Sequence, residues 1–547
     1  MLSQTFPGRG GLPRHRPLCP HHPRRCRAVS TGASYRNPVV PGFHPDPSVC
    51  RVGADYYLVC SSFEYFPGVP LLHSRDLVTW RQIGNILDRP GQLELPADTE
   101  ASRGIFAPTL RHHDGRFWLV TTNVSLGRHL IVTAPEPTGP WSDPVYFDLP
   151  HVDPSLAWDD DGTCWLTTSG VDAYRIDPDG GRVLEGPIPL WSGTGGQYPE
   201  APHLYRIDGW WYLLLSEGGT HTGHAVSVAR SRSPRGPFTP APANPILTHR
   251  GTDLPVQATG HGDLVQALDG SWWLVLLGIR ARGQWPPYHA LGRETFLAPV
   301  RWVDGWPVVD PVREVTPAPP GSAPAGATPA GPDTFHDDFD ATVLAPEWIS
   351  PRSRPDDCWS LTARPGWLTL HAVGATLDLA GATIVALRQR YHDSRTSVRV
   401  DPGTGVAGLT IRIDEAHHYD LEVRAGIVRV IGRAGPFRQV FATHAVPDGP
   451  LVLTIATRTH DLYPPTVTSA ADLAARTAPR GVRAAGCDMV TFEVAGPAGP
   501  VVLAELDGRY LSTEVAAGFT GRVVGMYVTG GSAAFDWFTH RPAAAPH

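Results

Sequence analysis

Five side chains precede a repeated glycine at a nearly constant distance. Four of them stand nine residues before their glycine and the first stands seven before it. The five are Asp46, Phe106, Asp153, Glu200 and His261, before Gly53, Gly115, Gly162, Gly209 and Gly270. Paired carboxylates can act as general acid and general base, because one can be held protonated while another stays ionised. The shared spacing therefore marks these residues as candidates for a catalytic group.

The chemistry open to three acids depends on whether they meet. Carboxylates in one cleft raise one another's pKa, and such perturbed groups are candidates for a functional site. Hydrolysis of a glycosidic bond needs one protonated acid and one carboxylate that activates water or attacks carbon. A third acid can keep the pKa of the proton donor high. Metal binding is a competing use of the cluster, and Asp-Pro pairs such as Asp46-Pro47 also start turns.

The repeat itself predicts the elements that position these residues. Its copies read GADYYL, GRFWL, GTCWL, GWWYL and GSWWL, at intervals of 62, 47, 47 and 61 residues. An Asp-Gly turn followed by aromatic residues, as in the last four copies, predicts a hairpin. Propeller blades repeat at this interval, so five copies predict a five-bladed β-propeller; five unrelated hairpins in a sandwich are the alternative. The innermost strands of all blades line one channel, where the five side chains should converge.

Composition divides the rest of the chain. Residues 1–33 contain six arginines and no acid, without the apolar stretch of a secretory signal, and are predicted to be a disordered extension. The propeller should span 34–314, a Pro/Ala/Gly-rich linker 315–333, and a β-sandwich 334–542, where alternating patterns such as 367–370 recur. Residues 461–486 should form a surface excursion. The predicted fold class is all-β, a five-bladed β-propeller followed by a concanavalin-like β-sandwich.

Charge and cysteine content limit the functional classes. The net charge is −7, which gives no basic surface for nucleic acid. All 46 basic residues are arginine, which indicates the codon bias of a GC-rich genome. No run of 18 apolar residues exists, so no membrane span is expected. Seven scattered cysteines without a Cys-x-x-Cys pair favour reduced thiols over a disulfide framework. A cytoplasmic location is therefore the expectation.

Several longer strings carry a resemblance to a known family. They are NPVVPGFHPDPSV (37–49), SSFEYFPGVPLLHSRDLVTW (61–80), GIFAPTLRHHDGRFW (104–118), GPWSDPV (139–145), DPSLAWDDDG (153–162), EAPHLY (200–205), ATGHGDLVQ (258–266), GRETFLAPVRWVDGWPVV (292–309) and FTGRVVGMY (519–527). Together they resemble family 43 glycoside hydrolases, in particular the two-domain β-xylosidases. The resemblance runs from about residue 35 to the C-terminus.

The resemblance implies a role for each acid. Asp46 resembles the general base, Glu200 the general acid, and Asp153 the residue that tunes and orients that acid. The family inverts the anomeric configuration, which implies base and acid carboxyls about 6.5–9.5 Å apart. Glu200 should stay protonated near neutral pH, helped by the negative charge of Asp153 and by desolvation.

The resemblance also implies contacts with the sugar. Arg293, in GRET, resembles an arginine that binds sugar hydroxyls, with a surface salt bridge as the alternative. Phe63 and Phe106 resemble aromatic walls, although a lone Phe is commonly a core residue, and the family commonly has Trp near Phe106. His261 resembles an axial histidine that could orient a carboxylate, bind water or help hold an ion. Phe519 resembles a sandwich residue that closes the pocket, which implies exo action.

The implied activity is exo removal of terminal β-D-xylose from xylo-oligosaccharides. The alternatives are an α-L-arabinofuranosidase, a non-catalytic carbohydrate-binding propeller and a metal-dependent hydrolase. No cofactor is expected to be required, and a structural Ca²⁺ could be held by FHDDFD (335–340) and FDWF (535–538). The expected partner is an oligosaccharide, with neither nucleic acid nor membrane, and a homo-oligomer is an open alternative.

Overall fold

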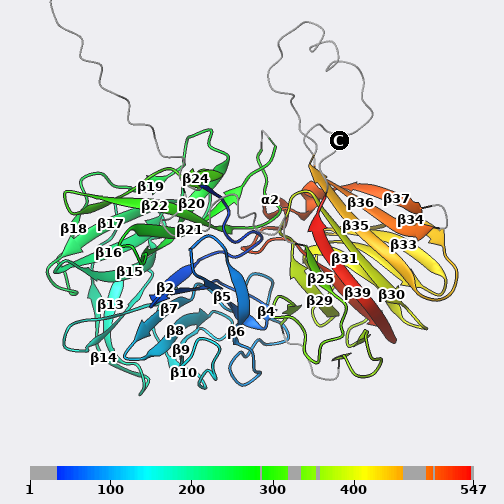
Figure 1. The fold of residues 1–547 in the computed structure, drawn as a ribbon, viewed down its shortest axis with the longest axis horizontal. Coiled ribbons are helices and arrows are strands. Elements are labelled where there is room, and N and C mark those ends of the chain that lie inside the picture. The colour runs from blue at the N-terminus through cyan, green and yellow to red at the C-terminus, as the bar shows by residue number, and fades with distance from the viewer. Residues whose placement is uncertain are drawn as a thin grey trace, which may run out of the picture. The chain divides into compact units, whose positions relative to one another are not determined.

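Five small antiparallel sheets follow one another along the first half of the chain (Figure 1). The computed structural model describes residues 34–283, 286–317, 334–352, 358–459, 488–496 and 499–543, all within one compact unit. In each sheet the strands pair in chain order, except that the last short strand of the fourth sheet (Leu247–Thr248) pairs with the third strand, so each sheet is one blade. The predicted five-bladed propeller is confirmed.

Each blade is built from consecutive strands of the chain. Blade 1 comprises β2 (Ser48–Val52), β3 (Asp55–Val59), β5 (Gly68–Ser74) and β6 (Arg81–Leu87); blade 2 comprises β7 (Thr109–His113), β8 (Arg116–Asn123), β9 (Arg128–Ala134) and β10 (Val145–Phe147). Blade 3 comprises β11 (Ser155–Trp158), β12 (Cys164–Thr168), β13 (Asp172–Asp177) and β14 (Arg182–Pro189). Blade 4 comprises β15 (Glu200–Ile207), β16 (Trp210–Glu217), β17 (Ala225–Ser231), β18 (Thr239–Pro240) and β19 (Leu247–Thr248); blade 5 comprises β20 (Val256–Gln266), β21 (Trp272–Arg280), β22 (Glu294–Val303) and β23 (Trp306–Val309).

The repeated glycines form the turn between the first two strands of each blade. All five have φ between 62° and 88°, the left-handed region that glycine enters without steric cost. In blades 2 and 4 the preceding residues, Asp114 and Asp208, also have positive φ (50° and 47°). Two successive positive φ values are what a type I′ hairpin turn requires. The Asp-Gly signal in the sequence therefore located the hairpins correctly.

The first strands of the blades form a closed ring. Strand β2 contacts β7 and β20, β7 contacts β11, and β15 contacts both β11 and β20. The N-terminal segment completes the closure, because β1 (Ser34–Arg36) pairs with β24 (Val315–Pro317) after blade 5. The Asn37 side chain also bonds both the N–H and the C=O of Leu297 in β22. Residues 315–317, which were expected to begin the linker, are instead part of this closure.

Asp263 of β20 bonds side chains of three other blades. Its carboxylate accepts from Ser48 Oγ at 2.7 Å, from Arg111 Nη1 at 2.8 Å and from Tyr205 OH at 2.6 Å. These partners come from blades 1, 2 and 4, and Arg111 also contacts His203 Nδ1 at 3.2 Å. Burial opposes ionisation of Asp263, but Arg111 and the other donors hold its pKa well below the usual range. We call these five residues the Asp263 network.

The second half of the chain forms two packed sheets, as predicted for a β-sandwich. One sheet contains β27 (Trp359–Ser360), β28 (Leu368–His371), β39 (Ser532–Pro542), β30 (Ser394–Asp401), β35 (Leu451–Thr459), β36 (Asp488–Gly496) and β37 (Gly499–Asp507), with β25 (Phe335–Asp337) on β39. The other contains β29 (Thr383–Arg388), β38 (Val523–Gly530), β31 (Val406–Asp414), β32 (His417–Arg424), β33 (Ile427–Ala434) and β34 (Phe437–Ala445).

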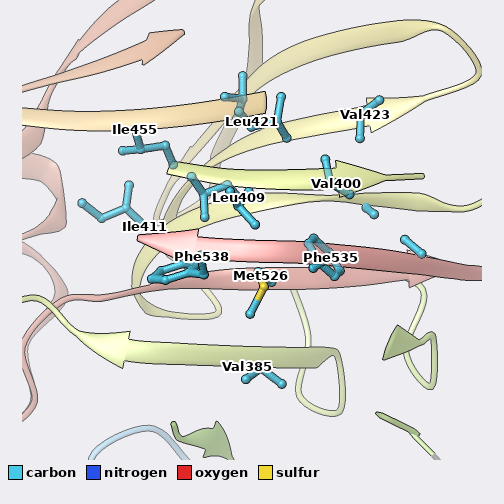
Figure 2. Packing of buried hydrophobic residues seen from close by; sticks show 14 of the residues in the cluster. Val385, Val400, Leu409, Ile411, Leu421, Val423, Ile455, Met526, Phe535 and Phe538 are labelled. Carbon is cyan, nitrogen blue, oxygen red and sulfur yellow. The ribbon is translucent and has the colours of Figure 1, made fainter. Parts of the chain in front are cut away.

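The core of the sandwich lies between these two sheets. Alternate residues of each strand point inward, as the two-residue period of a strand requires. Figure 2 shows Leu409 and Met526 from one sheet facing Phe535 and Phe538 from the other. All four side chains are buried. Between β37 and β38 the chain forms a 3₁₀ turn, η2 (Gly508–Leu511), and a short helix, α2 (Thr513–Ala516).

The propeller and the sandwich share a hydrophobic cluster and a two-stranded sheet. Strand β4 (Tyr65–Phe66), in a loop of blade 1, pairs with β26 (Ser350–Pro351). Phe63 and Tyr65 of the propeller pack in one buried cluster with Ile384 and Tyr527 of the sandwich. This cluster brings sandwich residues to the side of the propeller where Phe63 lies.

Some sequence predictions concern parts of the chain that are not described. The predicted extension 1–33, most of the linker (318–333) and the excursion 461–486 lie outside the described residues. Within the described ranges, Cys50, Cys60 and Cys164 are buried free thiols, as expected of reduced cysteines. No helix in the described part of the chain has the length and apolar character needed to cross a membrane.

The Asp263 network gives a prediction for stability. Asp263→Ala leaves the Arg111 guanidinium buried without its carboxylate, and breaking a buried ion pair in this way costs about 3–5 kcal/mol. We expect a loss of that size in the free energy of unfolding, measured by urea titration with tryptophan fluorescence. Asp310→Ala removes an exposed carboxylate paired with Arg301 and should change little. Equal small effects of the two substitutions would contradict the central role of Asp263.

Candidate active site

The ring of first strands brings four of the five phased residues to one site. Asp46, Asp153 and Glu200 stand immediately before or at the start of β2, β11 and β15, and His261 lies within β20. His261 Nδ1 is 3.6 Å from Asp46 Oδ1 and 3.7 Å from Glu200 Oε1. Asp153, Glu200 and His261 each offer a polar atom within 4.8 Å of the others. The convergence expected from blade phase is therefore present.

The backbone at this site departs from regular strand geometry. Asp46, Asp153 and His261 have φ of 56°, 53° and 45°, in the left-handed region. Such values are uncommon for residues other than glycine and cost about 1–3 kcal/mol each. The proline after each aspartate disfavours the right-handed helical region, as expected, but the acids adopt left-handed rather than extended backbone. Strain of this kind gathers at sites where a side chain must point in one direction.

Asp46 is held as a hydrogen-bond acceptor on both carboxyl oxygens. Arg293 Nη1 donates to Oδ1 at 2.8 Å, and Ser61 Oγ donates to Oδ2 at 2.5 Å. Asp46 is only 5% exposed. A buried carboxylate whose two oxygens are held by an arginine and a hydroxyl is fixed in one orientation, as a base that accepts a proton from water must be. Arg293 is thus a buried partner of Asp46, which excludes the surface salt bridge considered as its alternative.

The pKa values of Asp153 and Glu200 are shifted in the directions opposite to those expected from the sequence. Burial, with the charges of Glu200 and Asp46, raises the pKa of Asp153 to about 7, against the opposing charge of His261. Burial also acts to raise the pKa of Glu200, but the hydrogen bond with His224 and the nearby His261 outweigh it and lower that pKa. The expectation that the charge of Asp153 keeps Glu200 protonated is therefore wrong for the unliganded site. The two acids are close enough to titrate as one system.

His261 is a second cationic group at the site, beside Arg293. Burial alone would lower its pKa, but the charges of Asp46, Asp153 and Glu200 raise it to about 9. Its Nδ1 is nearly equidistant from Asp46 and Glu200. A protonated ring there offsets the repulsion among the three carboxyls.

Three phenylalanines form an aromatic wall beside Asp46. Phe519 stacks on Phe63 with ring centres 6.1 Å apart and meets Phe106 edge-on at 5.8 Å. The Arg293 guanidinium lies 5.3 Å from the Phe519 ring, and its Nη2 donates to the Phe519 carbonyl. Ser102 Oγ accepts from Phe519 N–H at 2.8 Å and fixes the loop. A sandwich residue therefore forms part of the wall, and Phe519 is 38% exposed. Phe63 is only 1% exposed and belongs to the buried cluster shared with the sandwich, so it is a core residue behind the wall, whereas Phe106 is partly exposed.

Three residues at the site were not found from the sequence. Ser61 bonds Asp46, Thr220 Oγ1 accepts from Arg293 Nη1 at 3.1 Å, and His224 Nε2 lies 3.0 Å from Glu200 Oε1. They lie beyond the first strand of their blades, so the spacing from the repeated glycine gives no signal for them. His224 falls in the string GGTHTGHA just before β17, where two histidines give no reason to prefer one.

The acids proposed for a structural Ca²⁺ have other partners. Asp337 accepts from Trp348 Nε1 at 2.7 Å, and Asp536 accepts from Arg399 Nη1 at 2.5 Å. Among the described residues, the group compact enough for a cation is Asp153, Glu200 and His261. The Ca²⁺ site in the sandwich stays a prediction.

Carboxyls that converge on a histidine beside an aromatic wall are an arrangement suited to glycoside hydrolysis. Comparisons with known proteins agree. The profile of Glycosyl hydrolases family 43 matches residues 35–307, and that of the Beta xylosidase C-terminal Concanavalin A-like domain matches 336–472 and 481–541. The chain belongs to glycoside hydrolase family 43.

Some of its relatives are named arabinofuranosidases and others are named xylosidases. A non-reducing end α-L-arabinofuranosidase of Bacteroides ovatus is 38% identical over 93% of this chain and 95% of the relative. A xylan 1,3-β-xylosidase of a Vibrio species is 34% identical over 75% and 83% of the two chains. Among solved structures, a xylan β-1,4-xylosidase of Bacillus halodurans has a TM-score of 0.80 at 31% identity, covering 93% of this chain and all of that one.

Asp153 gives a prediction for pH dependence. Its pKa in the folded protein lies above its ordinary 3.8, so between about pH 4 and 7 the folded protein retains a proton that the unfolded chain has released. Stability from this group is therefore lost as the pH rises through that range. Asp153→Asn removes this titration, so the free energy of unfolding of the variant should not fall for this reason as the pH rises. The difference between variant and wild type should therefore grow in favour of the variant with rising pH, by about 4 kcal/mol at most.

Urea unfolding at several pH values between these limits measures that difference. Asp310→Asn, at an exposed site, serves as the control and should show a constant difference from wild type. A constant difference for Asp153→Asn as well would contradict the raised pKa of Asp153.

Proposed function

We propose that the protein is an exo-acting, inverting β-xylosidase that removes terminal β-D-xylose from xylo-oligosaccharides. One observation carries the proposal: Asp46, held by Arg293 and Ser61, faces the Glu200–Asp153 pair across His261 in a site walled by Phe519 of the sandwich. Asp46 is the general base and Glu200 is the general acid. Asp153 is the neighbouring carboxyl whose titration is coupled to that of Glu200.

The reaction uses the two carboxyls on either side of His261. Asp46 accepts a proton from water as the water oxygen bonds to the anomeric carbon, while Glu200 delivers a proton to the leaving oxygen as the glycosidic bond breaks. His261 Nδ1 is 3.6 Å from Asp46 Oδ1 and 3.7 Å from Glu200 Oε1, so these two oxygens are separated by at most the sum of the two distances. That bound admits the lower end of the roughly 6.5–9.5 Å range of inverting enzymes and also the roughly 5–5.5 Å of retaining enzymes. The inverting separation stays a prediction.

The aromatic wall supports exo action. Phe519 and Phe63 stack over Arg293, so the sandwich covers the Asp46 side of the site. A pocket covered on this side can accept the end of a chain, whereas an endo enzyme needs an open groove for sugars on both sides. Aromatic faces pack on the apolar face of a sugar ring, which suits a pocket for one terminal residue.

An α-L-arabinofuranosidase is the second candidate. The observation that favours it is the 38% identity, over nearly the full length of both chains, to an enzyme with that name. The same pocket groups would bind either pentose through hydroxyls and ring faces. A non-catalytic carbohydrate-binding propeller is disfavoured, because a binder gains nothing from the strained backbone at Asp46 and Asp153.

Turnover of nitrophenyl glycosides tests the substrate. We expect hydrolysis of nitrophenyl β-D-xyloside at a higher kcat/KM than nitrophenyl α-L-arabinofuranoside, with activity unchanged by a chelator. The reverse preference would establish the second candidate. Loss of activity with chelator would support metal-dependent hydrolysis, and inactivity on both substrates would reject the proposal.

Two variants test the roles of the acids. Asp46→Asn and Glu200→Gln keep shape but remove the base and the acid, and each should lower kcat by roughly 10²–10⁴-fold while sugar binding persists. Proton NMR of the first-formed sugar should show α-xylose from a β-xyloside, as inversion requires. Full activity of both variants would contradict the assignment, and β-xylose as first product would contradict inversion.

A further inference from the structure

His224 is a fully buried histidine that touches Glu200 and has no part in the proton transfers assigned to Asp46 and Glu200. Its ring Nε2 lies 3.0 Å from Glu200 Oε1, and its side chain has no solvent exposure. The residue stands just before β17, and Thr248 Oγ1 of β19 donates to its carbonyl at 2.8 Å. Its position is therefore fixed by its backbone as well as by its ring.

The other nitrogen of the ring determines what Nε2 can do. His224 Nδ1 lies 3.3 Å from the carbonyl oxygen of Ala258. A carbonyl oxygen only accepts, so Nδ1 must carry the hydrogen. In a neutral ring Nε2 then has a lone pair and no hydrogen. A lone pair facing an ionised carboxylate would be repulsive, so the 3.0 Å contact with Glu200 must contain one proton, on the nitrogen or on the oxygen.

The backbone of blade 5 is shaped to receive this ring. Ala258 has φ of 54°, and the pairing of β20 with β21 shifts register on either side of Gly260. A methyl group at Gly260 would collide with Cε1 and both nitrogens of the His224 imidazole. The bulge therefore places the carbonyl of Ala258 next to the His224 ring, and Gly260, which has no side chain, leaves room for the same ring.

We propose that His224 is the positioning residue of Glu200 and stores the proton that Glu200 delivers. The inference rests on the proposed function. In the free site the proton lies between Nε2 and Oε1. As the glycosidic bond breaks and the leaving oxygen becomes a stronger base, this proton moves onto Glu200 Oε1 and from there to the leaving oxygen, which leaves Glu200 ionised and Nε2 without a proton. Asp46 meanwhile gains one proton from the attacking water, and release of product returns both groups to their starting state through solvent.

His261 is less suited to this task. Its Nδ1 is 3.6 Å from Asp46 and 3.7 Å from Glu200, beyond hydrogen-bond distance from either. It balances the charge of both acids, whereas His224 bonds Glu200 alone among the three acids. The two histidines therefore have separate roles.

Dependence on the leaving group tests the proposal. Leaving groups that need no proton, such as dinitrophenol, do not require the acid, whereas a sugar does. His224→Gln should lower kcat/KM for the unactivated disaccharide by about 100-fold, and change that for the dinitrophenyl glycoside little. The pentose used is whichever one the wild-type protein hydrolyses. An equal loss for both substrates, or no loss for either, would overturn the proposal.

His249 supplies a matched control. It is buried beside the same blade, its Nδ1 bonds the carbonyl of Val256 at 2.7 Å, and its Nε2 accepts from Val312 N–H at 3.1 Å. His249→Gln therefore perturbs a similar bonding pattern away from Glu200 and should not change the dependence on leaving group. Gly260→Ala should reproduce the effect of His224→Gln, and should add nothing in a His224→Ala background.

Nitrogen NMR of ¹⁵N-histidine protein tests the shared proton without turnover. In wild type, Nδ1 of His224 should carry a proton and Nε2 should show the shift of a protonated or proton-sharing nitrogen. In Glu200→Gln the amide donates to Nε2, whose shift should move to that of an unprotonated nitrogen. An unprotonated Nδ1 in wild type would overturn the proposal for His224, whether or not the protein hydrolyses a pentoside. Failure to hydrolyse any pentoside would reject only the proposed function.

Discussion

The buried carboxylate of Asp263 is the interaction on which the rest of the site depends. It accepts hydrogen bonds from blades 1, 2 and 4, and Arg111 extends the network to His203. The segments that carry Asp46 and His261 have positive φ at these residues, and members of the network follow them closely along the chain. Asp263 follows His261 by two residues, and Ser48 follows Asp46 by two. The network that joins the blades is therefore also the layer that fixes the direction of the groups in the neighbouring site.

This two-layer arrangement explains a repeated string in the sequence. Asp-Pro-Ser occurs at 46–48 and at 153–155. In each case the aspartate faces the site and the serine lies one layer deeper, where Ser48 bonds Asp263 and Ser155 bonds His203. The proline between them has no N–H to satisfy and restricts the aspartate before it. Each aspartate has a strained, positive φ. This backbone conformation lets the acid point into the site while the serine two residues later keeps its hydrogen bond.

The repeat in the sequence located the site residues on the first strands of the blades. Site residues that reach the site from later parts of a blade have no such pattern in the sequence. The spacing from the repeated glycine identified Asp46, Asp153, Glu200 and His261 because each belongs to the first strand of its blade or directly precedes it. His224 and Thr220 lie beyond that strand, where no period marks them. Phe519 was found through resemblance alone, because no local pattern connects it to Phe63, at the opposite end of the chain.

Protonation was the least predictable property, because it depends on single contacts within a few ångströms. Sequence reasoning expected Asp153 to be the charged neighbour of a protonated Glu200, but burial raises the pKa of Asp153, while the hydrogen bond with His224 lowers the pKa of Glu200. Across the site, Asp46 is paired with Arg293 and Glu200 with His224, while burial raises the pKa of Asp153 and His261 lies 3.6 Å from Asp46 and 3.7 Å from Glu200. The three acids therefore meet at one site with different means of offsetting their charge. The acid and base roles are therefore properties of the whole charge arrangement and not of the carboxyls alone.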